Sequence, residues 1–159
     1  KNRTNFIVQI ANDNSEGQIV LSGLIDDLDR LIELLNSSNI KFLKLPVSAP
    51  FHCELMNKAT EIMKKEIEKT NFQKVKNILI SNVTANEILS EEELKRLLIL
   101  QIESRVRWRE SVINMINKGV DQFIEIGPGK VLSGLVKRIN KSVKINSINS
   151  ESDIKDLKL

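Results

Sequence analysis

The chain is poor in the residues that build several common kinds of site. Its 159 residues contain no tyrosine, one tryptophan, one cysteine and one histidine. A single cysteine excludes an internal disulfide, which fits a reducing cytoplasm. One histidine and one cysteine cannot supply the four protein ligands of a structural zinc site. We therefore expect no metal, and the composition favours a cytoplasmic protein.

Long apolar runs and one-sided charge are also missing. No stretch approaches the roughly 20 apolar residues of a membrane helix, so we expect no membrane contact. The net charge is +3, and the lysines alternate with acidic residues, as in EIMKKEIEK and SEEELKR. With few aromatic side chains for base stacking, this pattern argues against a nucleic-acid partner. The opening KNRTNF has neither an initiating methionine nor the apolar core of a secretory signal, which suggests a fragment or an internal boundary.

What is present is the composition of a globular α/β protein, 41% hydrophobic and 28% charged. Two β-rich runs, residues 5–11 and 17–23, flank the turn-forming stretch NDNSE and predict a hairpin. A helix over residues 24–38 and a strand over residues 40–47 are expected next. The order strand, strand, helix, strand matches part of a ferredoxin-like unit.

The rest of the chain alternates between helix and strand, as in a parallel sheet covered by helices. Ser90 and Glu93 have the spacing of a helix capping box, and Gly119 is expected in the left-handed conformation that ends a helix. We expect helices over residues 53–69, 90–102, 107–119 and 131–140, strands over residues 76–85, 121–126 and 143–149, and a short helix or a frayed tail at the end.

His52 lies between a predicted strand exit and the helix that begins near Cys53. Reactive groups of open α/β sheets gather at such places. A general base, a metal ligand and an ordinary loop histidine all remain open on the residues alone. A Cys53–His52 dyad is disfavoured, because neighbours on a helix point about 100° apart.

The stretch EIGPGK superficially suggests a phosphate-binding loop. It fails that pattern, because Ile124 stands at the first glycine position and Val131 replaces the Ser or Thr. Gly127 and Gly129 still permit a close backbone approach. A turn shaped for packing is favoured over a direct ligand site.

Five motifs together resemble, in order and spacing, the C-terminal half of bacterial malonyl-CoA:acyl carrier protein transacylases. They are ANDNSEGQIVLSG, LPVSAPFHCELM, ISNVTA, RVRWRESV and EIGPGKVLSGLVKRI, and the similarity extends from about Ile7 to Ser147. The resemblance implies that residues 1–46 form an incomplete ferredoxin-like (ββαβ) subdomain. It also implies that residues 47–159 form the C-terminal portion of an α/β-hydrolase-like acyltransferase subdomain.

The resemblance implies an [acyl-carrier-protein] S-malonyltransferase of fatty-acid biosynthesis. In this family a serine in a GHSxGE motif takes malonyl from coenzyme A and passes it to the phosphopantetheine thiol of acyl carrier protein. His52 matches the general base and acid. Gln101 matches the residue whose main-chain carbonyl orients that histidine, although Arg105 stands where proline is usual. Malonyl-CoA and acyl carrier protein are the implied partners, and no cofactor is implied.

Other residues match positions around the substrate cleft that the resemblance implies. This cleft would be supported by Asn12 and Asn14 in the expected hairpin turn, and by the loop with Gly127 and Gly129. Lys41 and Lys44 match basic positions that meet the carrier protein or the coenzyme A phosphates, and solvated surface lysines are the alternative.

The nucleophile motif is absent from these 159 residues. They contain no GHSxGE and no G-x-S-x-G, and Ser22 is flanked by only one glycine. The arginine that pairs with the malonyl carboxylate and the glutamine beside the oxyanion hole are also unmatched. We expect the isolated chain to be inactive, either as a remnant or split half that needs an N-terminal partner, or as a non-catalytic carrier-protein-binding module. A chain without its N-terminal half should also expose an unpaired strand edge and apolar surface.

Overall fold

The computed structural model describes residues 6–74, 76–155 and 157. The predicted strand over residues 5–11 and the subdomain over residues 1–46 therefore begin outside the described residues. The elements are β1 (Val8–Ser15), β2 (Gln18–Gly23), α1 (Ile25–Ser37), a 3₁₀ turn (Glu54–Met56), α2 (Asn57–Lys69), α3 (Glu91–Gln101), α4 (Trp108–Asn117), β3 (Gln122–Ile126), α5 (Val131–Ile139), β4 (Lys144–Ile148) and α6 (Glu151–Lys155).

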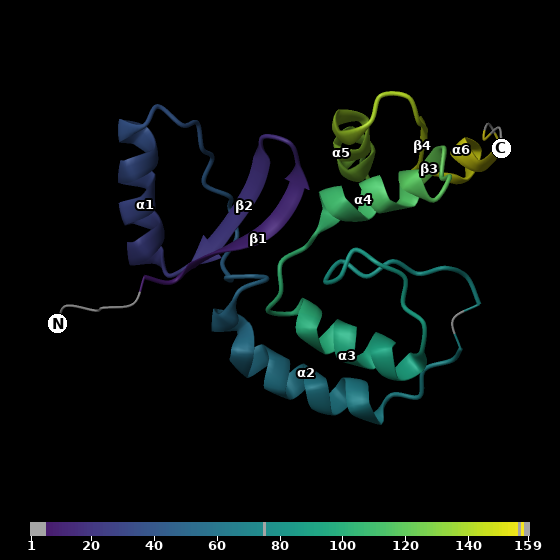
Figure 1. The fold of residues 1–159 in the computed structure, drawn as a ribbon, viewed down its shortest axis with the longest axis horizontal. Coiled ribbons are helices and arrows are strands. Elements are labelled where there is room, and N and C mark those ends of the chain that lie inside the picture. Colours follow the sequence, from purple (N-terminus) through teal and green to yellow (C-terminus); the bar gives the residue numbers. More distant parts are fainter. Residues whose placement is uncertain (1–5, 75, 156, 158–159) are drawn as a thin grey trace.

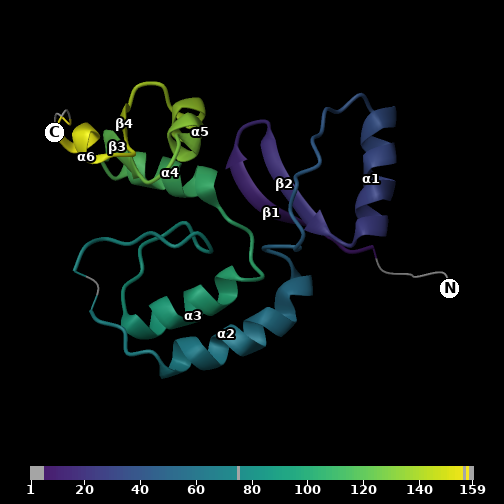
Figure 2. The same ribbon diagram turned by 180° about the vertical axis from the view of Figure 1, so that it is seen from behind.

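These elements form three groups joined by extended connections (Figure 1). The β1–β2 hairpin carries α1 on its outer side, α2 lies along α3, and α5 packs on the β3–β4 pair and against α4. The view from behind shows the same groups, with α4 bridging between the hairpin and α5 (Figure 2). The α/β class is confirmed, as helices with two small sheets.

The predicted hairpin is confirmed, but its turn is shorter than expected. β1 and β2 pair antiparallel, and the chain reverses at Glu16 and Gly17, where Gly17 has φ 74°. The placement of Asn12 and Asn14 in the turn was wrong, because both lie inside β1. A two-residue turn with glycine at positive φ is sufficient for the reversal, so the polar stretch continues as paired strand.

One face of β1 is buried although two of its residues are polar. Ala11, Asp13 and Ser15 are each at most 5% exposed, with the period of two expected for a strand. The strand contacts both α4 and α5. The hairpin is therefore packed against the C-terminal helices.

The predicted strand over residues 40–47 was wrong. The segment has no regular secondary structure, and Ile40, Phe42, Leu43, Leu45 and Val47 are all exposed. Apolar alternation gives a strand only when a neighbour accepts its backbone hydrogen bonds. Within the described part of the chain, no strand pairs with this segment. The third strand of the expected ββαβ unit is therefore not formed, and the ferredoxin-like description is not confirmed.

The predicted strand over residues 76–85 was also wrong. Ile80 forms a single antiparallel bridge with Glu87, and the chain between them turns tightly. The Ser81 hydroxyl accepts from the Val83 N–H, and Thr84 Oγ1 accepts from the Asn86 N–H. Such side-chain oxygens compete with sheet pairing for backbone donors, which explains why a β-rich sequence forms a loop here.

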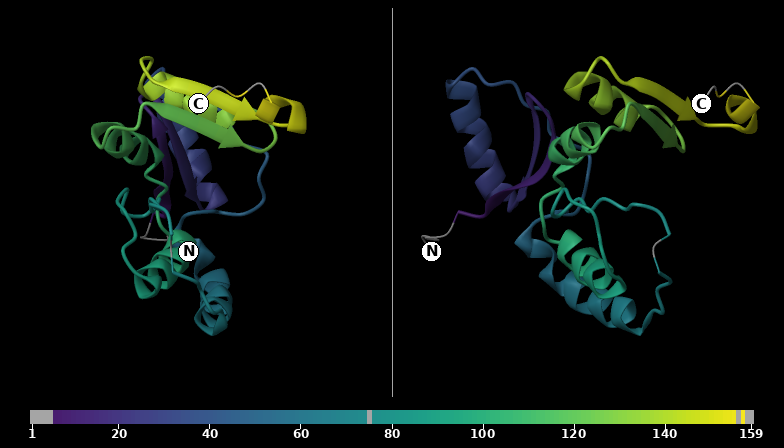
Figure 3. Two further views of the ribbon diagram at one scale, coloured as in Figure 1. Left: turned by 90° about the vertical axis from the view of Figure 1, so that its right-hand side faces the viewer. Right: turned by 45° about the vertical axis from the view of Figure 1, so that its right-hand side comes forward.

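The expected alternation of helix and strand is confirmed at the C-terminal end. β3 and β4 pair in parallel through the connecting helix α5, and Figure 3 shows the two strands side by side. The loop after β3 has Gly127 at φ 137° and Gly129 at φ 92°, conformations that favour glycine. The short helix expected near the C-terminus is present as α6.

Two predicted helix boundaries are confirmed. Ser90 Oγ accepts from the Glu93 N–H at the start of α3, and a Glu93 carboxylate oxygen accepts from the Leu89 N–H. Gly119 has φ 96° after α4, and its N–H group donates to the Ile116 carbonyl. Every helix in the described ranges is too short or too polar to cross a lipid bilayer.

The chain exposes far more surface than a compact protein of its size. Its accessible surface is 11709 Å², whereas an 18.1 kDa monomer is expected to expose about 8,100 Å². Many large apolar side chains contribute to this excess, as the sequence predicted. The most exposed are Leu43, Leu89, Ile126, Ile78, Val131, Ile25, Ile62 and Leu34.

Candidate active site

His52 occupies a strained position just before the 3₁₀ turn. Its backbone has φ 58°, in the left-handed region that non-glycine residues rarely adopt. The next residue, Cys53, is fully buried, and its sulfur accepts the Leu55 N–H over 3.5 Å. This buried anchor fixes the direction in which His52 leaves the chain. Strain of this kind is characteristic of functional sites.

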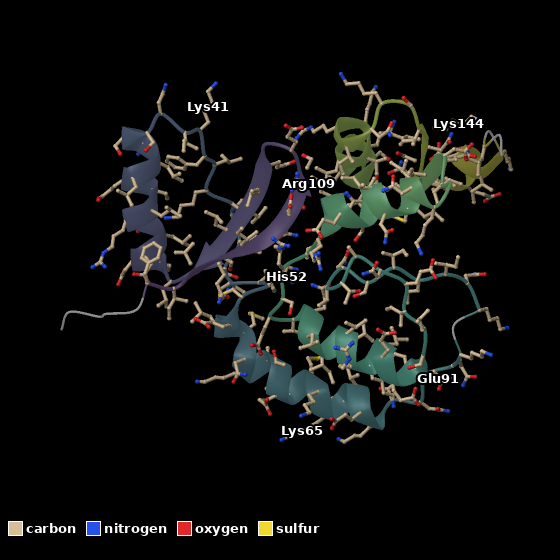
Figure 4. The ribbon with its side chains drawn as sticks, viewed as in Figure 1. Lys41, His52, Lys65, Glu91, Arg109 and Lys144 are labelled. Carbon is tan, nitrogen blue, oxygen red and sulfur yellow. The ribbon has the colours of Figure 1, made fainter. Side chains whose placement is uncertain are left out.

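The imidazole is held by the end of a helix distant in sequence. His52 Nδ1 lies 2.9 Å from the main-chain oxygen of Gln101, the last residue of α3. The last carbonyls of a helix have no partner within it, so this oxygen is free to accept. Figure 4 shows His52 between the hairpin and the end of α3.

The contacts at Nδ1 define which ring nitrogen carries the proton. The Gln101 side-chain Nε2 also lies 3.3 Å from Nδ1, and an amide N–H there would require Nδ1 to accept. The carbonyl is closer and can only accept, and the amide has another acceptor in the Ser104 oxygen at 3.2 Å. The proton is therefore assigned to Nδ1. This leaves the Nε2 lone pair of His52 available as a base.

The loop that follows Gln101 is paired with β1. The Val106 N–H donates to the Ala11 carbonyl over 2.8 Å, and the Asp13 N–H donates to the Val106 carbonyl over 2.9 Å. Gln9 Oε1 of the same strand accepts the Glu54 N–H next to the histidine turn. β1 therefore supports both partners of the His52–Gln101 contact.

Ion pairs hold the same loop to α4. Glu110 accepts from Arg105 over 3.1 Å and from Arg107 Nε over 2.7 Å. Arg107 also donates to the carbonyls of Val83 and Thr84. The sequence analysis missed Glu110 and Gln9. The spacing of Arg107 and Glu110, three residues apart, could have indicated the Arg107–Glu110 pair.

The other predicted site residues do not all lie near His52. Asn12 forms a bridge with Val106, so it adjoins the loop that follows Gln101. Lys44 is paired with Asp29 of α1 over 3.2 Å. Lys41 projects beyond the end of α1 and away from His52 (Figure 4).

Asn14 and the glycine loop lie in other surroundings. Asn14 is half-buried beside the irregularity between Asp13 and Ser15 in β1. The N–H of Gly127 donates to Ile148 of β4, and that of Gly129 donates to the Asn149 side chain. The structure thus brings His52, Gln101 and Asn12 into one region, and their roles there stay predictions.

Comparison with known proteins supplies an independent measure of the resemblance. The malonyl CoA-acyl carrier protein transacylase of Bacillus subtilis is 41% identical over 149 residues, which are 93% of this chain and 47% of that protein. The transacylase structure from Clostridium perfringens superposes with a TM-score of 0.90 at 40% identity, covering 94% of this chain and 48% of the other.

A third match is a malonyl-transacylase in complex with a type II PKS acyl-carrier protein, with a TM-score of 0.89 and 33% identity over 94% of this chain and 48% of the other. No protein-family model matches the chain. The chain spans about half the length of the curated relatives it matches. The resemblance indicated by the five motifs is thus confirmed: nearly the whole chain is similar to about half of a malonyl-CoA:acyl carrier protein transacylase.

Proposed function

We propose that this chain provides the general base for transfer of malonyl from coenzyme A to acyl carrier protein, and that His52 is that base. The observation that carries the proposal is the 2.9 Å contact between His52 Nδ1 and the Gln101 carbonyl. It orients the ring and leaves Nε2 free to take a proton, which is what an unactivated serine hydroxyl requires of its partner.

The proposed reaction consists of two acyl transfers. In the first, His52 Nε2 takes the serine hydroxyl proton while the oxygen bonds to the malonyl thioester carbon. The C–S bond then breaks, and the coenzyme A thiolate takes the proton from His52. In the second, His52 takes the proton of the phosphopantetheine thiol, whose sulfur attacks the serine ester, and returns that proton to the serine oxygen. No cofactor is needed, because the coenzyme A thioester and the phosphopantetheine thiol are both substrates.

The serine belongs, in this proposal, to a polypeptide segment equivalent to the half of the relatives that this chain does not match. The 11709 Å² surface supports such a partner, because it exceeds the value for a compact monomer by about 3,600 Å². Large permanent interfaces bury areas of this order. Residues 1–46 would then complete a ferredoxin-like subdomain, and residues 47–159 an α/β-hydrolase-like one, in a cytoplasmic enzyme of fatty-acid synthesis.

Incubation of the chain with malonyl-CoA, followed by intact-mass measurement, tests the assignment of the nucleophile. We expect no ester adduct on the 159-residue chain alone. Co-expression with the N-terminal half of a close relative should restore transfer to acyl carrier protein. His52→Ala should abolish that restored activity, whereas Lys65→Ala on the exposed side of α2 should retain it. A stable adduct on the isolated chain, or full activity of the His52→Ala assembly, would refute the proposal.

A non-catalytic carrier-binding module is the rival function, and Lys41 is the residue on which it depends. Lys41 is exposed, whereas Lys44 already neutralises Asp29. Titration of the chain with acyl carrier protein distinguishes the two functions. Binding that is lost in Lys41→Glu, without any activity in the co-expressed assembly, would favour the module.

A further inference from the structure

The carbonyl that holds His52 has a second potential donor in the same chain. Gln101 is the last residue of α3, and one further helical turn would direct the Arg105 N–H toward the Gln101 oxygen, four residues earlier. That bond would compete with His52 for the same acceptor. The orientation of the histidine therefore depends on keeping Arg105 out of a helical position.

The chain leaves the helix immediately after Gln101. The Leu100 carbonyl accepts from the Glu103 N–H over 3.2 Å, which tightens the final turn, and from the Ser104 N–H over 2.9 Å, which is the last bond of α-helical spacing before Gln101. The Gln101 amide then donates to the Ser104 oxygen. These bonds close the helix end, and the Val106 N–H, one residue beyond Arg105, donates to the Ala11 carbonyl of β1, so the backbone is held there while the Arg105 side chain is held separately.

Glu110 fixes the Arg105 side chain. It lies in the first turn of α4, and one carboxylate oxygen accepts from Arg105 Nη2 over 3.1 Å. The other oxygen accepts from Arg107, whose guanidinium also reaches the carbonyls of Val83 and Thr84. Arg107 thus holds the Glu110 carboxylate in place, and Glu110 in turn holds the side chain of Arg105.

We propose that Glu110 is a positioning residue for His52. By holding Arg105 away from α3, Glu110 keeps the Gln101 carbonyl free for the Nδ1–H of His52, and so keeps the basic lone pair on Nε2. This inference deepens the proposed function and rests on it, since the orientation matters only if His52 is the base. It concerns the tautomer of one ring, which can be measured without any catalytic assay.

The test is the tautomer ratio of the imidazole in the full 159-residue chain. His52 is the only histidine, so the ring nitrogens of an ¹⁵N-labelled sample give one unambiguous pair of NMR signals. In alkaline buffer, where an imidazole is neutral, we expect the proton on Nδ1 in the unmodified chain. In Glu110→Gln the ratio of Nδ1–H to Nε2–H should fall about fivefold, the effect of losing one ordinary hydrogen bond. Glu110→Asp, which keeps the charge on a shorter side chain, should give an intermediate ratio.

Two further variants separate positioning from charge and from general destabilisation. Arg105→Ala should produce the same fall, and combining it with Glu110→Gln should add nothing. Glu87→Gln is the matched control, because it removes an equal charge from a 2.6 Å pair with Lys118, just beyond the other end of α4. Its ratio should stay that of the unmodified chain.

The outcomes distinguish the two proposals. An unchanged ratio in folded Glu110→Gln overturns the positioning role, and if that variant fails to fold, an unchanged ratio in Arg105→Ala overturns it equally. A fall of the same size in Glu87→Gln also overturns it, because the effect would then be one of charge. A proton on Nε2 in the unmodified chain contradicts the orientation of the base itself, and with it the proposed function.

Discussion

Arg109 of α4 donates from Nη2 to Asp13 Oδ2 of β1 over 2.8 Å, across 96 residues of sequence. The Asp13 side chain is only 7% exposed, whereas that of Arg109 is 41% exposed. The hydrogen bond that Arg109 donates to Asp13, and then the negative charge of Asp13, raise the pKa of Arg109 above its ordinary value. This pair therefore fixes the hairpin against the C-terminal helices through a buried carboxylate.

Arg109→Ala should lower the free energy of unfolding, because it removes the arginine that pairs with the buried Asp13 carboxylate. The midpoint of urea unfolding, followed by circular dichroism, measures this loss. Lys69→Ala is the control, since its pair with Glu66 is exposed on both sides and should contribute less than about 0.5 kcal/mol. Equal losses in the two variants would contradict the structural role of the buried pair.

Glu125 should make the stability of α5 depend on pH. The Ser133 side chain first, and then the backbone N–H groups of Ser133 and Leu132, lower the pKa of Glu125 below its ordinary 4.5. A lowered pKa means that its contribution is complete above pH 4.5 and is lost as the pH falls through the lowered value. Urea midpoints of the unmodified chain and Glu125→Gln should differ at neutral pH and converge in acid.

Glu61→Gln, on the exposed side of α2, is the control for the effect of removing one carboxylate. Its urea midpoint should follow that of the unmodified chain across the same pH series. If the difference between Glu125→Gln and the unmodified chain stays constant into acid, Glu125 does not act through its ionised form.

Ser90 should stabilise the start of α3. Its hydroxyl accepts the Glu93 N–H over 3.1 Å, so Ser90→Ala leaves one of the first helical donors without its partner. We expect a loss of about 1 kcal/mol in unfolding free energy. Ser142→Ala, at an exposed position after α5, should change stability little. A Ser90→Ala variant as stable as Ser142→Ala would show that water replaces the cap without cost.

Two glycines should respond to alanine in opposite directions. At Gly23 an added Cβ would lie 2.2 Å from the Ile7 oxygen and 2.9 Å from Val8 Cα, so the end of the β1–β2 ladder must open. At Gly134, inside α5, the added carbon would meet no heavy atom within 4 Å. Thermal unfolding should therefore show Gly23→Ala to be destabilised and Gly134→Ala to gain up to about 1 kcal/mol from better helix propensity. A stabilised Gly23→Ala would mean that β1 and β2 separate easily at this end.

The elements that could be predicted from sequence are those whose signals are local. The hairpin depends on Gly17, the start of α3 on Ser90 and Glu93, and the end of α4 on Gly119, and all three are confirmed. Each is determined by residues within a few positions of one another, so one stretch of sequence contains the whole cause.

The failures concern features that depend on distant neighbours. Residues 40–47 have the alternation of a strand, but alternation cannot supply the pairing partner. Glu110 was not identified from the sequence, because its pairing with the loop after α3 depends on where α4 places it. For His52 the single-residue signal was ambiguous, and only the register of several motifs singled it out. The Gln101 contact came from the resemblance, and the structure supplies its geometry.

The left-handed backbone of His52 has an evolutionary consequence. At φ 58° any side chain other than glycine carries a conformational penalty of order 1–3 kcal/mol, so the position is held at the expense of stability. Drift toward glycine would relieve that penalty and would remove the imidazole in the same step. Under the proposal that His52 is the base, this position exchanges some stability for activity, and a chain released from selection for transfer is expected to lose the histidine early.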